Sequence, residues 1–210
     1  MSDEIVFYTM PMSRGRIVRW MLEELGRPYR AEILDAATMK APAYLAINPM
    51  GKVPAIRHGE VVVTETGAIC AYLADAFPQA GLAPPPGDAR RGAYFRWMFF
   101  AAGPVEGAMA ARALGAEVKP EHRRMLGWGD LADLMTGLES AIAGRDYILG
   151  DRFSAADVFF GAHVGWGMQF GVIEPRPTLQ RYSERLQARP AAVRAREIDD
   201  ALIAQAQAAG

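Results

Sequence analysis

The sequence predicts an α/β domain followed by an all-helical domain. Short β-like runs alternate with helical runs only within the first part of the chain, up to about residue 80. Beyond that point no strand pattern recurs, and apolar residues repeat at helical spacing. Between the two regions lies Ala83-Pro84-Pro85-Pro86-Gly87, where proline blocks both helix and sheet and favours a stiff, extended spacer. These observations predict domains over residues 1–81 and 89–210, joined by a proline-rich linker over 82–88.

The first region has the element order β-α-β-α-β-β-α. Its first helical run ends at Gly26, a natural C-terminal cap, and Gly59-Glu60 is a tight hairpin signal between two β-like runs. The crossover rule makes the first two strands parallel and the hairpin antiparallel. This order is that of a thioredoxin-like domain. The predicted strands are Ile5–Tyr8, Tyr29–Ile33, Ala55–His58 and Val61–Thr64, and the predicted helices cover 17–25, 41–46 and 66–77.

The second region is a series of helical runs separated by glycine and proline. Ser154 with Asp157 three residues later forms a capping box, with the aspartate as the returning acceptor. We expect this box to start a buried helix, so that replacing Asp157 damages folding rather than chemistry. The predicted helices cover about 89–114, 121–143, 155–170, 178–188 and 191–208.

Composition excludes several classes of function. A formal net charge of −1 over 210 residues gives no electrostatic case for a nucleic-acid partner. No apolar run reaches the roughly 20 residues needed to cross a bilayer, and the acidic start of the chain does not read as a signal peptide. Cys70 is the one cysteine, so no internal disulfide can form, and His58, His122 and His163 make no metal pattern. A reducing, cytoplasmic setting with no metal is therefore expected.

Three segments of the first region carry chemistry. Ser13 offers a hydroxyl at the start of a helix, where free N–H groups and the helix dipole favour negative charge. Lys52-Val53-Pro54 offers an extended backbone just before a proline. Glu65-Thr66 offers a carboxylate and a hydroxyl at the start of another helix. Together they fit a peptide-like thiol held by backbone bonds and helix ends.

With these segments, the whole chain resembles the cytosolic glutathione S-transferase superfamily, in its bacterial form. The segment Gly150 to Phe160, which includes the capping box, is similar to one characteristic of the family's second domain. The resemblance implies a thioredoxin-like glutathione-binding domain, an all-helical domain and glutathione as co-substrate. It also implies a homodimer.

The resemblance assigns a role to each segment. Ser13 would donate a hydrogen bond to the glutathione thiolate. Val53 would pair with the cysteinyl backbone next to a cis Pro54, and Lys52 would reach the glycyl carboxylate. Thr66, as the N-cap of its helix, would bind the γ-glutamyl carboxylate with the free amides, and Glu65 would accept from the ammonium group.

Alternatives remain at the sulfur. Ser13 also suits a plain N-cap that bonds the amide of Arg16, and one hydroxyl cannot fill both roles at full strength. Tyr8 is a second candidate activator, because several branches of the family use a tyrosine at the end of this strand. In the resemblance, Ser13 falls where bacterial beta-type members carry a cysteine. Because this loop has no nucleophilic cysteine, thiol transfer through a mixed disulfide on the protein is not expected. Cys70 lies on an apolar helical face and is expected in the core.

The predicted function is therefore activation of glutathione as a thiolate for attack on a small hydrophobic electrophile. The alternatives are a non-catalytic glutathione-fold binding or regulatory protein, or a glutathione-dependent isomerase or peroxidase. Methionine and aromatic side chains suit varied hydrophobic ligands. The candidates for the electrophile pocket are Met10, Met12, Phe100, Met109, Trp166 and Phe170.

Overall fold

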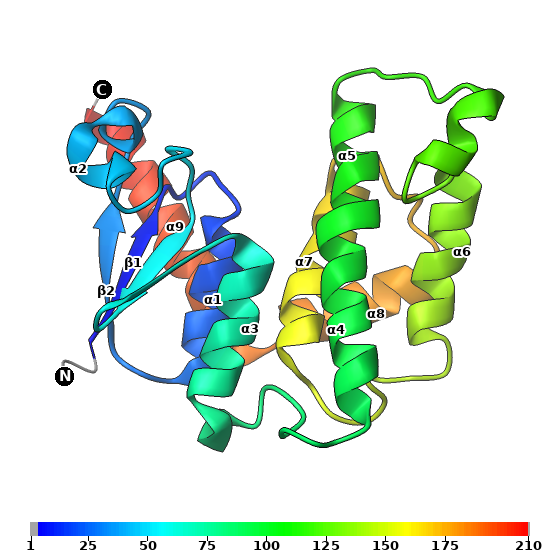
Figure 1. Ribbon diagram of the computed structural model, residues 1–210, viewed down its shortest axis with the longest axis horizontal. Coiled ribbons are helices and arrows are strands. Elements are labelled where there is room, and N and C mark those ends of the chain that lie inside the picture. Colours follow the sequence, from blue (N-terminus) through cyan, green and yellow to red (C-terminus); the bar gives the residue numbers. More distant parts are fainter. Residues whose placement is uncertain (1–3, 210) are drawn as a thin grey trace. The chain divides into compact units, whose positions relative to one another are not determined.

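The computed structural model describes residues 4–209 and divides the chain into two compact units (Figure 1). The first unit runs up to Ala80 and also includes the segment from Arg189 onward. The second unit is Gly81–Ala188, and the proline-rich segment 82–88 lies at its beginning. The last helix of the chain thus belongs to the first unit, although it follows the second in sequence.

A four-stranded sheet forms the core of the first unit, with the strand order β2-β1-β3-β4. The strands are β1 (Ile5–Thr9), β2 (Tyr29–Ile33), β3 (Ala55–His58) and β4 (Val61–Thr64). β1 and β2 are parallel, whereas β3 is antiparallel to both β1 and β4. The predicted strands, their directions and the thioredoxin-like order are therefore confirmed.

Two helices pack against each other on one face of this sheet, α1 (Gly15–Leu25) and α3 (Thr66–Ala76) (Figure 1). α1 is buried at every position from Ile17 to Leu22, so it is covered on more than one side. Gly26 ends the helix in the left-handed conformation with φ 67°, as its sequence predicts. The connection from β2 to β3 contains a 3₁₀ turn (Thr38–Lys40) and the short helix α2 (Pro42–Leu45).

The last helix, α9 (Pro190–Ala209), docks on α1 through charged pairs. At the centre Arg19 and Asp199 are both fully buried, with Arg19 Nε donating to Asp199 Oδ1 at 2.7 Å. The guanidinium also lies 5.3 Å from the centre of the Phe7 ring. Burial raises the pKa of Asp199, while the charge of Arg19 opposes that rise. Because a buried ion loses its hydration, each partner depends on the other to remain charged there.

The second unit is all-helical, as predicted. Its first helices, α4 (Arg90–Phe100) and α5 (Glu106–Ala113), form one column interrupted by a π-helical turn over Ala101–Val105 (Figure 1). Pro104 lies inside that turn and has no N–H to donate, which accounts for a break in the regular ladder there. The remaining α-helices are α6 (Leu131–Ile142), α7 (Ala155–Gln169) and α8 (Pro177–Gln187).

One predicted helix is shorter than expected. The run 121–143 was expected to be continuous, but it divides into a 3₁₀ segment (Pro120–Met125), a turn, and α6. Gly129 has a positive φ of 67°, and the Asp130 side chain then accepts from the amide of Asp133 and starts α6 as its N-cap. The helical period of residues 121–130 was therefore misleading, because local turn and cap chemistry overrode it.

The predicted capping box at the start of α7 is confirmed. Asp157 is fully buried and accepts four hydrogen bonds: from the Ser154 amide (2.9 Å) and hydroxyl (3.0 Å), from the Ile148 amide (2.7 Å) and from the Tyr182 hydroxyl (2.8 Å). One carboxyl group therefore ties together the preceding loop, the start of α7 and the middle of α8. Its role is structural.

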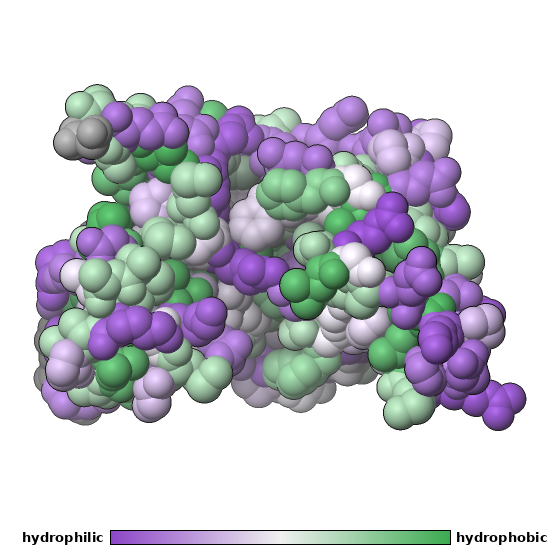
Figure 2. Space-filling view, turned by 90° about the horizontal axis from the view of Figure 1, so that it is seen from above, coloured by the Kyte–Doolittle hydropathy of each residue, from purple (hydrophilic) through white to green (hydrophobic). Residues whose placement is uncertain are grey.

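Side chains of different hydropathy are interspersed on the face that Figure 2 shows. Within residues 4–209, no helix is both long and apolar enough to cross a membrane.

Asp157 should make stability depend on pH in a specific direction. Burial raises its pKa to about 6, against an ordinary value of 3.8, while its four hydrogen bonds lower it. Between these values the folded state holds the proton more tightly than the unfolded state. The contribution of Asp157 to the free energy of unfolding is therefore full below about pH 4 and falls, by roughly 1–3 kcal/mol, up to about pH 6.

Urea unfolding of the wild type and of Asp157→Asn at several pH values measures this contribution, because other titrating groups cancel in the difference. We expect the variant to be less stable throughout, since an amide cannot accept from all four donors. The stability difference should narrow from pH 4 to 6. A difference that widens would mean that the hydrogen bonds outweigh burial.

Candidate functional site

The register of the sheet brings the three predicted segments to one end of the first unit. Tyr8 of β1 pairs with Ala55 of β3, and Ala55 pairs with Thr64 of β4. The loop after Thr9, the segment before Ala55 and the turn after Thr64 therefore all leave the sheet at the same end. Ser13, Val53-Pro54 and Glu65-Thr66 lie in these three connections. Residues separated by more than 50 positions in sequence are thus neighbours around one rung of the sheet.

Ser13 lies just before α1, half-buried, and its hydroxyl already has two partners. It donates to the Met10 carbonyl at 2.6 Å and accepts from the Gly15 amide at 3.0 Å. The alternative in which the Ser13 hydroxyl caps the Arg16 amide is wrong, since that amide bonds to the backbone carbonyl of Ser13 at 3.2 Å. The hydroxyl is therefore held at the helix N-terminus, but its proton points at a backbone oxygen.

Gly15 is required by this close packing. A Cβ at Gly15 would collide with the buried Thr9 hydroxyl and touch the Ser13 hydroxyl. Absence of a side chain therefore allows the end of β1, the loop and the first turn of α1 to approach closely.

The second segment has the backbone geometry that the sequence suggests. The Val53–Pro54 peptide bond is cis, which confirms that expectation, and Pro54 is buried beside β3. The Lys52 side chain is exposed. The Lys52 carbonyl accepts from the Tyr44 hydroxyl at 2.6 Å and from the Asn48 side-chain amide at 2.8 Å.

Tyr44 and Asn48 were not singled out from the sequence. The helix that carries Tyr44 is too short to show a clear period, and Asn48-Pro49 reads as an ordinary turn dipeptide. That dipeptide, five residues before Val53-Pro54, was the available signal.

Glu65 adopts a conformation that side chains other than glycine rarely take, with φ 68° and ψ 121°. Among residues 4–209 it is the one non-glycine residue with positive φ. Glu65, not Thr66, is the N-cap of α3, so the expectation that Thr66 caps the helix was wrong by one position. Thr66 is instead the first helical residue and is buried. Neither side chain bonds the first amides of α3, which remain directed outward from the helix N-terminus.

The alternatives at the sulfur are placed differently. Tyr8 is half-buried, and its ring packs against Tyr44 with 5.8 Å between ring centres, which is a packing role. Cys70 is fully buried in α3, and burial raises its thiol pKa to about 12. A thiol in that state is a poor nucleophile, so Cys70 belongs to the core as expected.

The residues predicted for the electrophile pocket are divided between the units and differ in exposure. In the first unit Met10 is half-buried and Met12 is 73% exposed. In the second unit Met109 is buried, Phe100 and Trp166 are half-buried, and Phe170 is 68% exposed. The pocket itself stays a prediction.

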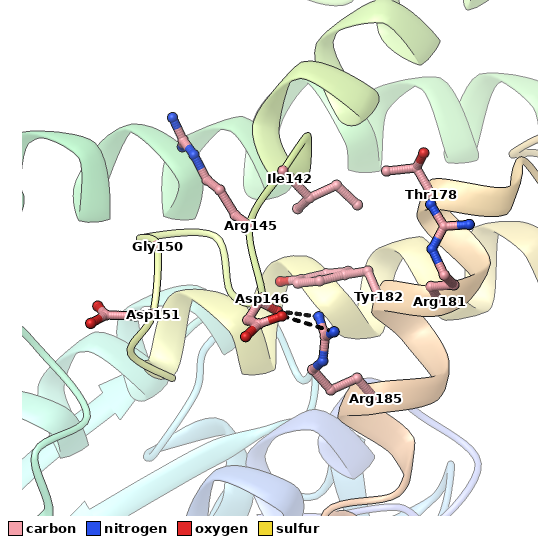
Figure 3. Close-up of a pocket in the computed structure, with 10 residues that line it drawn as sticks. Ile142, Arg145, Asp146, Gly150, Asp151, Thr178, Arg181, Tyr182 and Arg185 are labelled. Carbon is pink, nitrogen blue, oxygen red and sulfur yellow. Dashed lines mark hydrogen bonds and ion pairs between the residues drawn. The ribbon is translucent and has the colours of Figure 1, made fainter.

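The second unit has a depression of about 480 Å³ between the end of α6, the following loop and α8 (Figure 3). Ile142 and Tyr182 form its apolar part, and Arg185 forms a salt bridge with Asp146, with 2.9 Å between Nη2 and Oδ1. None of the predicted site residues lines it. No group of three or more metal-binding side chains occurs within residues 4–209.

Comparison with known proteins identifies the class. Residues 7–81 match the family model "Glutathione S-transferase, N-terminal domain". The chain is 30% identical, over 179 residues, to a maleylacetoacetate isomerase of Pseudomonas aeruginosa; the match covers 76% of this chain and 77% of that protein. The chain therefore belongs to the glutathione S-transferase superfamily.

Solved structures support the same architecture. A glutathione transferase of Methylococcus capsulatus superposes with a TM-score of 0.77 and 29% identity, covering 93% of this chain and 98% of that one. A sphingomonad glutathione S-transferase complexed with glutathione gives a TM-score of 0.73 with 29% identity and the same coverage. Homologous proteins thus bind glutathione on this fold.

The positive φ of Glu65 should lower the free energy of unfolding of the protein. A non-glycine residue in such a region costs about 1–3 kcal/mol, part of which glycine recovers. We expect Glu65→Gly to raise the free energy of unfolding by about 0.5–1 kcal/mol, measured by urea unfolding. Glu65→Ala is the matched control: it removes the carboxylate but keeps a Cβ, so it should show no gain. Equal stability of the two variants would contradict this prediction.

Proposed function

We propose that this protein is a glutathione transferase that binds glutathione in its first unit and activates the thiol as a thiolate. The observation that supports it most is the shared rung Tyr8–Ala55–Thr64, around which the three predicted segments gather. Each segment supplies a different recognition element: a hydroxyl at a helix start, an extended backbone, and a carboxylate beside free helix amides. A γ-glutamyl-cysteinyl-glycine tripeptide needs all three.

The γ-glutamyl end would bind at the start of α3. Its carboxylate would accept from the first amides of α3 and from the Thr66 hydroxyl, where the helix dipole favours an anion. The Glu65 carboxylate would accept from its ammonium group. The unusual backbone of Glu65 supports this assignment, because such conformations persist mainly where a site requires them.

The rest of the tripeptide would bind along the second segment. The cysteinyl backbone would pair with Val53 in the manner of an added strand, and exposed Lys52 would offer its charge to the glycyl carboxylate. Sulfur would then face the loop after β1.

Ser13 would stabilise the thiolate at the start of α1. Its proton would turn from the Met10 carbonyl to the sulfur, while the Gly15 amide continues to donate to its oxygen. A charge-assisted hydrogen bond of this kind outweighs a neutral one to a carbonyl. The thiol proton would pass to solvent, and the thiolate sulfur would attack an electrophilic carbon of a small hydrophobic substrate. As the C–S bond forms, the substrate's leaving group departs with the electrons of the broken bond; in an addition to an activated double bond, the π bond opens instead and the adjacent carbon takes a proton from water. Because glutathione must be reduced, we assign this activity to the cytoplasm.

A second candidate function is glutathione-dependent isomerisation. The specific observation in its favour is the 30% identity to a maleylacetoacetate isomerase. Such a reaction would use the same activated thiol, which adds to the substrate and leaves again. Measuring the concentration of free glutathione during turnover distinguishes the two reactions. Conjugation consumes glutathione, whereas isomerisation leaves its concentration unchanged.

The ultraviolet absorbance of bound glutathione thiolate, measured across pH, tests the proposal. We expect the wild type to show a thiolate near neutral pH. In Ser13→Ala the apparent pKa of the bound thiol should rise by about 1–2 units, because one hydrogen bond to a charged group is lost.

Tyr8→Phe is the matched control and should leave that apparent pKa unchanged. A thiolate that survives in Ser13→Ala but is lost in Tyr8→Phe would transfer the role to Tyr8. Glutathione binding with no thiolate in the wild type would favour a non-catalytic binding protein.

We further propose that the protein acts as a homodimer. Apolar side chains are exposed in each unit, on β4 (Val61 and Val62) and on α4 (Phe95 and Phe99, the latter 72% exposed). Such surfaces are typical of protein interfaces. Analytical ultracentrifugation should give about twice the mass of 22.9 kDa, and Phe99→Glu should shift the protein toward monomer. A monomeric wild type at micromolar concentration would overturn this.

A further inference from the structure

We infer that Tyr44 and Asn48 are positioning residues for glutathione: together they fix the Lys52–Val53 peptide so that the Val53 N–H faces the ligand. This inference rests on the proposed function and assigns a role to two residues that do not themselves touch glutathione. They act through the Lys52 carbonyl, which both of them bind.

The contacts to this carbonyl are short and protected from water. The Tyr44 hydroxyl donates to Lys52 O at 2.6 Å, and Asn48 Nδ2 donates to it at 2.8 Å. Tyr44 and Asn48 are each only 4% exposed, whereas the side chain of Lys52 is exposed. A carbonyl oxygen has two lone pairs, so two donors satisfy it completely. This oxygen cannot turn toward a ligand without leaving two buried donors unpaired.

The fixed carbonyl determines the direction of the next N–H. The Lys52–Val53 peptide is trans and planar, so the Val53 N–H points opposite to the Lys52 carbonyl. It therefore points away from Tyr44 and Asn48. Within the described residues this N–H has no hydrogen-bond partner, and Val53 is only half-buried. An unpaired donor held in one direction is ready to bind an acceptor from a peptide-like ligand.

Each anchor is itself fixed by its surroundings. The Tyr44 ring packs on Tyr8, and burial raises the Tyr44 pKa to about 12, so its hydroxyl remains a donor at neutral pH. Asn48 uses its other side-chain atom, Oδ1, to accept from the Met50 amide at 3.1 Å. The backbone carbonyl of Asn48 accepts from the Gly51 amide at 2.8 Å. The chain between α2 and β3 thus folds back on itself and presents Lys52 O to both donors.

Two variants remove one anchor each. Tyr44→Phe deletes the hydroxyl and keeps the ring on Tyr8. Asn48→Asp keeps the acceptor for the Met50 amide but replaces the donor with an oxygen that repels the Lys52 carbonyl. Tyr72→Phe is the matched control, because it also removes one tyrosine hydroxyl from the first unit, the one bonded to His58 at 2.9 Å.

Isothermal titration with reduced glutathione gives the affinity of the folded protein, and urea unfolding gives stability separately. Loss of one anchor should raise Kd about three- to tenfold, the range expected for one hydrogen bond. The rise in Kd of the double variant should exceed the product of the two single rises, since the remaining donor still restrains the carbonyl in each single variant and neither does in the double variant. Tyr72→Phe should change Kd less than about twofold. A merely structural role would lower stability and leave Kd unchanged.

The outcomes separate this inference from the function on which it depends. If the wild type binds glutathione and the double variant binds it equally well, the positioning role is overturned and the proposed function stands. If the wild type binds no glutathione at millimolar concentration, both are overturned. Equal losses of affinity in Tyr72→Phe and Tyr44→Phe would also contradict the inference, because the effect would not be specific to the Lys52 carbonyl.

Discussion

The hydrogen-bonded rung through Tyr8, Ala55 and Thr64 is the constraint on which the first unit depends. A register shift of one residue would turn every side chain of the shifted strand to the other face of the sheet. It would also move one connection away from the other two. The buried positions of β1 and β3, among them Phe7 and Ile56, therefore fix the place of Ser13, Val53 and Glu65. Packing of the core and geometry of the candidate site are decided by the same pairing.

The hydrogen bonds of the candidate site show which groups are committed before any ligand binds. The Lys52 carbonyl and the Ser13 hydroxyl are both occupied, whereas the Val53 N–H and the first amides of α3 are not. The occupied groups set directions, and the unoccupied ones can bind. The Ser13 proton is the exception, because it must exchange the Met10 carbonyl for the ligand sulfur. We expect the Ser13 hydroxyl to turn toward the sulfur only when the sulfur is a charged thiolate, because a neutral thiol is a weaker acceptor than the Met10 carbonyl.

The sequence predicted most of the architecture, because hydrophobic period, glycine caps and the hairpin signal are local. It also predicted the capping box of Ser154 and Asp157. It could not predict that Tyr182 and Ile148 also bond Asp157, since those contacts depend on tertiary packing. The positive φ of Glu65 was equally hidden, because glutamate has no preference for that region. Tyr44 and Asn48 were missed for a related reason. Both side chains bind a backbone carbonyl, and a contact to the backbone cannot be predicted from the pattern of side chains. In the second unit, the period of 121–130 suggested a helix that cap chemistry at Asp130 excluded.

The buried pair of Arg19 and Asp199 has a consequence for the order of events during synthesis. The two residues are 180 positions apart, and Asp199, the partner of Arg19 in α9, emerges from the ribosome after the whole second unit. Until then the guanidinium of Arg19 in α1 lacks the carboxylate that compensates its burial, so this part of the first unit's packing cannot be completed. The helical unit, continuous in sequence from Gly81 to Ala188, has no such wait. Domains usually fold as they are made, from the N-terminus onward. Here the later unit is free to finish first, because the face of α1 that carries Arg19 is covered only after α9 has been made.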